Sequence, residues 1–202
     1  MSTPPAASAI ELRRATVADA AALANLHASE IDEGFLVALG GPFLRRIYRR
    51  AVLSSRAFAI AAVDGERVVG FVAAAEETRA FYREFLSRDA IVAGLVALPR
   101  IARSPRRVWE TLRYGVRDDG DDLPDAEIFA VAVDPSQRGV GVGGRLVVAA
   151  LDELEARGIV GARVVAAAGN GAALRMYRGA GFRNRATIEV HRDVPQEVLV
   201  WP

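Results

Sequence analysis

The sequence contains neither cysteine nor lysine. The absence of cysteine excludes a disulfide framework and thiolate metal ligands, and it removes the usual thiol nucleophile of covalent acyl transfer. The absence of lysine excludes a P-loop, in which a lysine contacts the phosphates. The two histidines, His27 and His191, have no neighbouring metal ligands in the sequence, so they predict no zinc site. We therefore expect chemistry that needs neither a metal nor a cysteine.

Excess charge and long apolar segments are also missing. The 26 basic and 25 acidic side chains nearly cancel to a formal net charge of +1, which gives no electrostatic footprint for nucleic acid or an anionic membrane. The longest apolar run, residues 90–99, is far shorter than the roughly 20 residues that span a bilayer. Residues 1–9 lack the features of a signal peptide and predict a disordered tail. We expect a cytoplasmic protein that neither binds nucleic acid nor inserts into membranes.

Apolar periodicity is what the sequence does have, over residues 10–202, and the length predicts a single domain. Two β-rich runs are joined by Asp64-Gly65, a strong signal for a hairpin turn. Residues 162–168 are almost entirely apolar, which predicts a strand buried on both faces. The predicted strands are 10–15, 57–63, 67–75, 127–133, 162–168, 182–192 and 197–201, and the helices of the second half are 143–157 and 172–178.

Residues 78–125 do not follow this periodicity. They carry aromatic residues, many arginines and prolines at positions 99 and 105, and then a run of aspartates. Because a structureless loop of this length is improbable inside a compact domain, we predict a helical insertion between the third and fourth strands. Its segregated charge fits either a solvated face or a wall over a substrate site.

The residues that point to chemistry form a loop between a predicted strand and a predicted helix. The segment Arg138-Gly-Val-Gly-Val-Gly-Gly144 has four glycines in its last six positions. Glycine permits positive φ angles and lets the backbone approach an anion closely. The free N–H groups and the dipole at the start of the next helix favour negative charge. The loop therefore predicts a diphosphate site but does not identify the diphosphate.

Several interpretations of this loop compete. Gly139, Gly141 and Gly144 match the dinucleotide fingerprint G-x-G-x-x-G, but the next strand ends in Ala-Ala-Gly-Asn, without the expected acidic residue. A purely structural glycine turn would lower stability without the compensation of a ligand. The remaining interpretation is the diphosphate of coenzyme A, which a second block of residues supports.

The second block runs from Asn170 to Phe182 and reads Asn-Gly-Ala-Ala-Leu-Arg-Met-Tyr-Arg-Gly-Ala-Gly-Phe. With both blocks, the chain resembles the GNAT acetyltransferases, whose loop reads Q/R-x-x-G-x-G/A and whose second block reads N-x-x-A-x-x-x-Y followed by G-F. Arg138, Gly141 and Gly143 match the first pattern. The resemblance covers most of the chain outside the insertion.

This resemblance implies the GNAT fold, an α/β (α+β) architecture with a central mixed, mostly antiparallel sheet, a splayed parallel strand pair and flanking helices. It also implies acetyl-CoA as cosubstrate, with the pantetheine arm between the splayed strands and the pyrophosphate on the glycine loop. Asn170 would contact the pantetheine arm, although its position also suits a helix N-cap. The residues implied to contact acetyl-CoA are Val131, Ala132, Val133, Arg138, Gly139, Val140, Gly141, Val142, Gly143, Gly144, Asn170 and Tyr177.

For catalysis, the resemblance implies Tyr177 as the general acid that protonates the leaving thiolate, with simple packing as the alternative. Glu127, early in the strand before the loop, is the expected base, and a water chain is the alternative. On a regular strand Glu127 would share a face with Phe129 and Val131, unless a bulge intervenes.

The resemblance also implies that the first two helices and their joining loop, here residues 30–48, shape the acceptor pocket. The candidate residues there are Glu30, Glu33 and Phe35. The carboxylates of Glu30, Asp32 and Glu33 would attract a cationic amine, although a solvated acidic turn explains them equally well. We expect direct attack of a primary amine on acetyl-CoA in a ternary complex, with an amino sugar or another small amine as acceptor. The alternatives are a non-catalytic acyl-CoA-binding or sensor domain and a protein N-terminal or lysine acetyltransferase. A homodimer is compatible with the sequence.

Overall fold

The computed structural model describes residues 10–31, 39–89, 123–191 and 194–202. The predicted tail at 1–9 and most of the predicted insertion lie outside these ranges. The strands are β1 (Glu11–Arg14), β2 (Ala57–Asp64), β3 (Arg67–Ala75), β4 (Glu127–Val133), β5 (Ala162–Ala167), β6 (Arg183–His191) and β7 (Val194–Trp201). The helices with defined bounds are η1 (Val17–Asp19), α1 (Ala20–Glu30), α3 (Gly41–Leu53), η2 (Pro135–Gln137), α6 (Val142–Ala156) and α7 (Gly171–Gly179).

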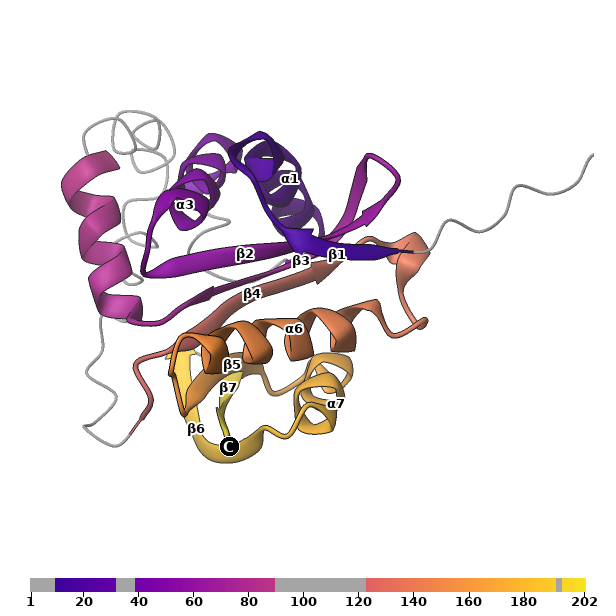
Figure 1. The fold of residues 1–202 in the computed structure, drawn as a ribbon. Coiled ribbons are helices and arrows are strands. Elements are labelled where there is room, and N and C mark those ends of the chain that lie inside the picture. Colours follow the sequence, from indigo (N-terminus) through magenta and orange to yellow (C-terminus); the bar gives the residue numbers. More distant parts are fainter. Residues whose placement is uncertain (1–9, 32–38, 90–122, 192–193) are drawn as a thin grey trace, which may run out of the picture.

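Within the described ranges, the seven strands form one sheet in the order β1-β2-β3-β4-β5-β7-β6 (Figure 1). Neighbouring strands are antiparallel except for β4 and β5, which are parallel. The predicted mixed, mostly antiparallel sheet with one parallel pair is therefore confirmed. The predicted hairpin is β2–β3, where Gly65 has a φ of 60° in the turn.

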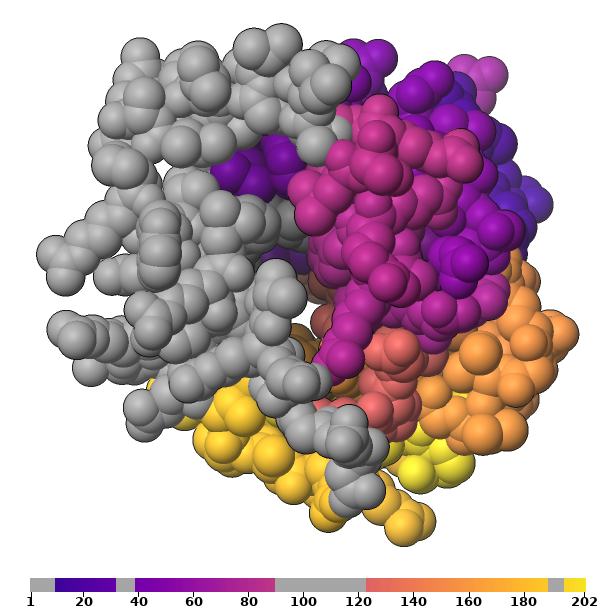
Figure 2. All heavy atoms as spheres, turned by 90° about the vertical axis from the view of Figure 1, so that its left-hand side faces the viewer, coloured from indigo at the N-terminus to yellow at the C-terminus, as the bar shows by residue number. Residues whose placement is uncertain are grey.

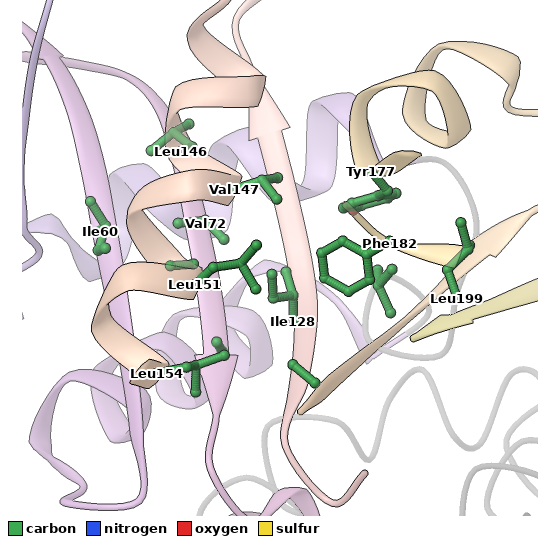
Figure 3. Close-up of a cluster of buried hydrophobic side chains, with 14 of the residues drawn as sticks. Ile60, Val72, Ile128, Leu146, Val147, Leu151, Leu154, Tyr177, Phe182 and Leu199 are labelled. Atoms are coloured by element: carbon green, nitrogen blue, oxygen red, sulfur yellow. The ribbon is translucent and has the colours of Figure 1, made fainter. Parts of the chain in front are cut away.

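Helices cover both faces of the sheet, with α1 and α3 on one side and α6 and α7 on the other (Figure 1). On the first face, Leu23 and Tyr48 from the helices pack with Phe71 of β3. On the second face, residues of α6 and α7 pack with Ile128 of β4, and Tyr177 and Phe182 lie side by side in this cluster (Figure 3). The two buried clusters place the sheet as a layer between two pairs of helices.

The prediction that both faces of β5 are buried is wrong. Its side chains alternate between buried and half-buried, and the buried ones, such as Val164, belong to the cluster beneath α6 and α7. On the opposite face α1 and α3 pack over β2, β3 and β4, so they leave β5 half-covered by the described residues. Arg163 occupies this half-covered face.

Residues 78–89 are helical and begin the predicted insertion after β3. The ring of Phe85 meets that of Phe43 edge-on at 5.4 Å, and Arg50 of α3 donates a hydrogen bond to Asp89 at 2.7 Å. Figure 2 shows this helix in magenta across one end of the molecule, with the start of β4 visible beneath it. Among the described helices, none is long and apolar enough to cross a membrane. The cytoplasmic location stays a prediction.

Candidate functional site

The two parallel strands are joined at one end only. Glu127 and Arg163 are the one pair in register between β4 and β5, and the Arg163 N–H donates to the Ala126 carbonyl at 2.8 Å. Beyond this joint, β4 continues its pairing with β3 as far as Val133, while β5 pairs with β7. A gap between β4 and β5 therefore opens toward the glycine loop.

The backbone of β4 presents to this gap hydrogen-bonding groups that β5 does not pair beyond the joint. The Asp134 N–H donates to the Val69 carbonyl at 2.8 Å, so Val133 and its partner in β3 form a non-hydrogen-bonded pair of the antiparallel ladder. Backbone groups alternate in direction along a strand, so those of Val131 and Val133 point toward β5. Those of Ala132 point toward β3 instead. Of the three residues predicted to contact pantetheine, Val131 and Val133 are the ones that face the gap.

The glycine loop follows directly at the open end of the gap. Gly139 and Gly141 have φ angles of 80° and 86°, a conformation that costs an L side chain strain. Gly141 is the N-cap of α6, and its carbonyl accepts from the Arg145 N–H at 3.1 Å. The N–H groups of the first turn of the helix, at Val142, Gly143 and Gly144, consequently have no partner within the helix. The predicted anion site is thus a helix N-terminus with an exposed loop, which includes Val140.

Two contacts hold the loop in place. The Asp134 carboxylate accepts from the backbone N–H and the hydroxyl of Ser136 at 2.9 and 2.6 Å, and these bonds lower the pKa of Asp134. At Gly143, an added Cβ would lie 2.7 Å from the sulfur of Met176 in α7, so a larger residue there would require the flexible Met176 side chain to shift. The loop geometry therefore depends on a turn at one end and on helix packing at the other.

Arg138 connects the loop to α1. Its Nε donates to the Val133 carbonyl at 3.2 Å, and its Nη2 forms a short ion pair with Glu30. The Glu30 side chain is 12% exposed and that of Arg138 is 55% exposed. The structure thus places Glu30, predicted to bind the acceptor, against the first residue of the predicted cofactor loop. Glu33 and Phe35, the other predicted acceptor residues, lie outside the described ranges.

Tyr177 lies on α7, in the cluster that includes Ile128 of β4 and Val164 of β5. Its ring meets that of Phe182 edge-on at 5.7 Å, and no hydrogen-bond partner of its hydroxyl lies in the described part of the chain. Burial raises the pKa of Tyr177 well above its ordinary value. The side chain is therefore a protonated phenol at neutral pH, which can donate a proton or a hydrogen bond but cannot act as a base.

Asn170 is the N-cap of α7. Its side-chain oxygen accepts from the Ala173 N–H at 3.0 Å, which confirms the capping interpretation. The amide nitrogen of this exposed side chain takes no part in that bond, so contact with a ligand in the gap remains compatible with the cap.

Glu127 lies at the joint of the two strands. Arg163 Nε donates to its carboxylate at 3.1 Å, and both side chains are mostly buried. A bulge leaves Phe129 unpaired, so Phe129 and Ala130 both face α1 and α3, while Val131 faces α6 and α7. Glu127 therefore shares a face with Phe129, whereas the bulge that was the stated exception puts Val131 on the other face.

Two residues near Glu127 were not predicted from the sequence. Tyr82, in the helix at 78–89, has a pKa raised by burial and by the charge of Glu127, so it lies within electrostatic reach of that carboxylate. Arg163 is the only charged residue in the apolar strand Ala162–Ala167, and that isolation is the signal that could have identified it. The carboxylate predicted as a base is thus paired with the Arg163 guanidinium and contributes to the raised pKa of Tyr82.

Comparisons with known proteins agree with this geometry. The sequence pattern described as the acetyltransferase (GNAT) family matches residues 26–182. A mycothiol acetyltransferase of Thermobispora bispora is 39% identical over 72 residues, which are 36% of this chain and 24% of that protein. A ribosomal protein bS18-alanine N-acetyltransferase of Salmonella typhimurium is 42% identical over 66 residues, 33% of this chain and 44% of that protein. The chain therefore matches less than half the length of either relative.

Solved structures show the same fold. The ribosomal-protein-S18-alanine N-acetyltransferase from Escherichia coli has a TM-score of 0.60 at 15% identity, covering 96% of this chain and 93% of that one. NAA60 from Arabidopsis thaliana in complex with acetyl-CoA also has a TM-score of 0.60, at 16% identity, covering 95% of this chain and 97% of that one. Because the family pattern extends over β2 to β5, the glycine loop and α7, the chain belongs to the acetyltransferase (GNAT) family.

Proposed function

We propose that this protein is an N-acetyltransferase that moves the acetyl group of acetyl-CoA to a primary amine. The observation that carries the proposal is the gap between β4 and β5, which opens onto a glycine loop with free N–H groups. Coenzyme A thioesters fit both parts. Their diphosphate suits the start of α6, and their amide-bearing pantetheine arm suits an unpaired strand edge. The curated relatives are named as acetyltransferases, which supports the same reaction.

In this proposal, backbone groups of Val131 and Val133 hold the pantetheine amides in the gap. The residues from Arg138 to Gly144 bind the diphosphate, mainly through backbone N–H groups, and Asn170 contacts the arm from the other side. The thioester then lies near Val131, whose N–H stabilises the oxyanion that forms during attack.

The chemistry is a direct transfer in a ternary complex. The neutral amine attacks the acetyl carbon, the carbon–sulfur bond breaks, and the thiolate takes a proton from Tyr177. The amine loses one proton to Glu127 or to a water chain. Glu127 points away from the α6 side, where Tyr177 lies, so the proposed base and acid are on opposite faces of the sheet. This arrangement suits an amine that approaches from one side while the thiolate is protonated from the other.

The acceptor is proposed to be a small amine such as an amino sugar. The relatives include a mycothiol acetyltransferase and a ribosomal protein bS18-alanine N-acetyltransferase. The N-terminal amine of a protein is therefore the second candidate acceptor. A panel containing an amino sugar, simple primary amines and an alanine-terminated peptide distinguishes the two.

The test is acetyl transfer from labelled acetyl-CoA by wild type, Tyr177→Phe and Tyr48→Phe. We expect Tyr177→Phe to lower kcat by roughly 10²- to 10⁴-fold while acetyl-CoA binding, measured by calorimetry, is retained. Tyr48, buried under α1, is the matched control and should retain activity. A wild-type protein that binds acetyl-CoA and acetylates no amine would leave the non-catalytic binding domain as the function. Full activity of Tyr177→Phe would remove Tyr177 from the mechanism.

A further inference from the structure

An ion pair crosses the end of β4 from one face of the sheet to the other. Glu30 is the last residue of α1, which packs on the first face, and Arg138 precedes α6, which packs on the second. The two residues are 108 positions apart in the sequence. Their contact thus ties the segment that leads from α1 into the expected acceptor region to the loop that is proposed to bind the diphosphate.

The guanidinium of Arg138 is held on two sides and is free on a third. Of its five N–H donors, the one on Nε is used by the Val133 carbonyl and one on Nη2 by Glu30. The two on Nη1 and the second on Nη2 have no partner among the residues that the structure describes. The side chain is still more than half exposed, so these donors remain accessible to a ligand.

The contact with Val133 fixes where the guanidinium lies. The Val133 carbonyl faces the gap between β4 and β5, and Val133 is the last residue of β4 before the loop. Arg138 is therefore anchored at the open end of the gap. An unrestrained arginine at this position would have to lose considerable rotamer freedom on binding an anion, whereas a braced one has lost it already.

We propose that Glu30 is a positioning residue for the cosubstrate, which braces Arg138 so that its free N–H groups meet the diphosphate. This inference rests on the proposed function. It also assigns Glu30 to the donor side of the reaction, in place of the acceptor role expected from the sequence. The charges of Glu30 and Arg138 offset each other within the pair, so in this inference Glu30 acts by orienting the guanidinium and not by adding charge.

The experiment compares two acetyl donors that differ in the diphosphate. Acetyl-CoA carries it, and S-acetylpantetheine has the same thioester and arm without it. We expect Glu30→Gln to weaken acetyl-CoA binding by roughly 2- to 5-fold, the range of a partly exposed ion pair, and to leave S-acetylpantetheine unchanged. In the double variant Glu30→Gln/Arg138→Gln, affinity should equal that of Arg138→Gln alone, because Glu30 acts through Arg138.

The control is Glu77→Gln. Glu77 forms an ion pair with Arg56 at 3.0 Å in which the carboxylate is more exposed than that of Glu30, and its loss should affect neither donor. Equal weakening of both donors by Glu30→Gln would mean that the pair only supports the fold, which overturns the inference. Unchanged acetyl-CoA affinity with a raised KM for the amine would return Glu30 to the acceptor and overturn it as well. A wild-type protein that binds no acetyl-CoA would refute the proposed function itself, independently of any Glu30 variant.

Discussion

Gly141→Ala and Gly144→Ala form a matched pair that separates backbone conformation from packing in the glycine loop. A Cβ built at either glycine has no atom within 4 Å, so neither substitution creates a clash. Gly141 has a φ of 86°, and the left-handed conformation costs an L residue about 1–2 kcal/mol. Gly144 lies in the first turn of α6 with a negative φ, where alanine in place of glycine stabilises a helix by about 0.5–1 kcal/mol.

The free energy of unfolding of the two variants should therefore differ by about 1.5–3 kcal/mol, with wild type between them. For a chain of this length the difference corresponds to roughly 3–12 °C in Tm. Urea denaturation followed by circular dichroism measures the free energy directly. In calorimetry, Gly141→Ala should weaken acetyl-CoA binding about tenfold, the equivalent of one lost charge-assisted hydrogen bond from the loop. Gly144→Ala should bind within about twofold of wild type.

The refuting results are specific. If both variants unfold at the same urea concentration, the positive φ of Gly141 is not what requires glycine there. If both lose acetyl-CoA affinity equally, the loop conformation is not what arranges its N–H groups around the diphosphate.

Two further predictions concern the pH dependence of stability. Hydrogen bonds from Arg13 and Thr16 hold the pKa of Asp19 well below its usual range, so its contribution to stability is complete above about pH 4 and is lost as the pH falls further. Asp19→Asn should therefore lower the unfolding free energy at pH 7 by about 1–3 kcal/mol and flatten its fall below pH 4 in urea titrations. Burial against Tyr48 lowers the pKa of His27 to about 4. The unfolded chain therefore binds a proton at His27 more readily than the folded chain does. The free energy of unfolding should consequently fall by at most about 3 kcal/mol from pH 6.5 to 4. This fall should vanish in His27→Gln, and a profile parallel to wild type would contradict the assignment.

Local signals predicted those parts of the fold that local chemistry determines. The Asp64-Gly65 turn predicted the β2–β3 hairpin because few residues adopt the turn's positive φ as readily as glycine. The apolar run of β5 was misread because two-sided burial depends on which helices cover the sheet. That is set by α1 and α3, far away in the sequence. The bulge at Phe129 likewise arises from register with β3 and left no pattern in the strand itself.

The candidate site likewise has parts that local sequence determines and parts that depend on the topology of the fold. The glycine loop and the cap at Asn170 are local, and both could be located from sequence spacing. The partners of Arg138 and Glu127 are not local, because an ion pair between distant residues depends on topology. From the sequence we expected Glu30 in an acceptor pocket, because acidic residues cluster there. The structure instead shows its carboxylate paired with the guanidinium of Arg138, which belongs to another element.

A gap between two parallel strands needs something to hold it open as well as something to hold it closed at one end. The pair Glu127–Arg163 and the backbone bond to Ala126 close one end. Toward the other end, the rings of Tyr177 and Phe182 pack against both strands on the face of the sheet that α6 and α7 cover. The two strands could not collapse onto each other without displacing these rings. Tyr177 therefore has two roles in the proposed enzyme, as part of this packing and as proton donor. Phenylalanine at this position keeps the ring and removes only the hydroxyl, whereas alanine would also leave a cavity beneath the gap. A loss of kcat shared by Tyr177→Phe and Tyr177→Ala, with acetyl-CoA affinity lost only in the latter, would separate the chemical role of the phenol from its structural one.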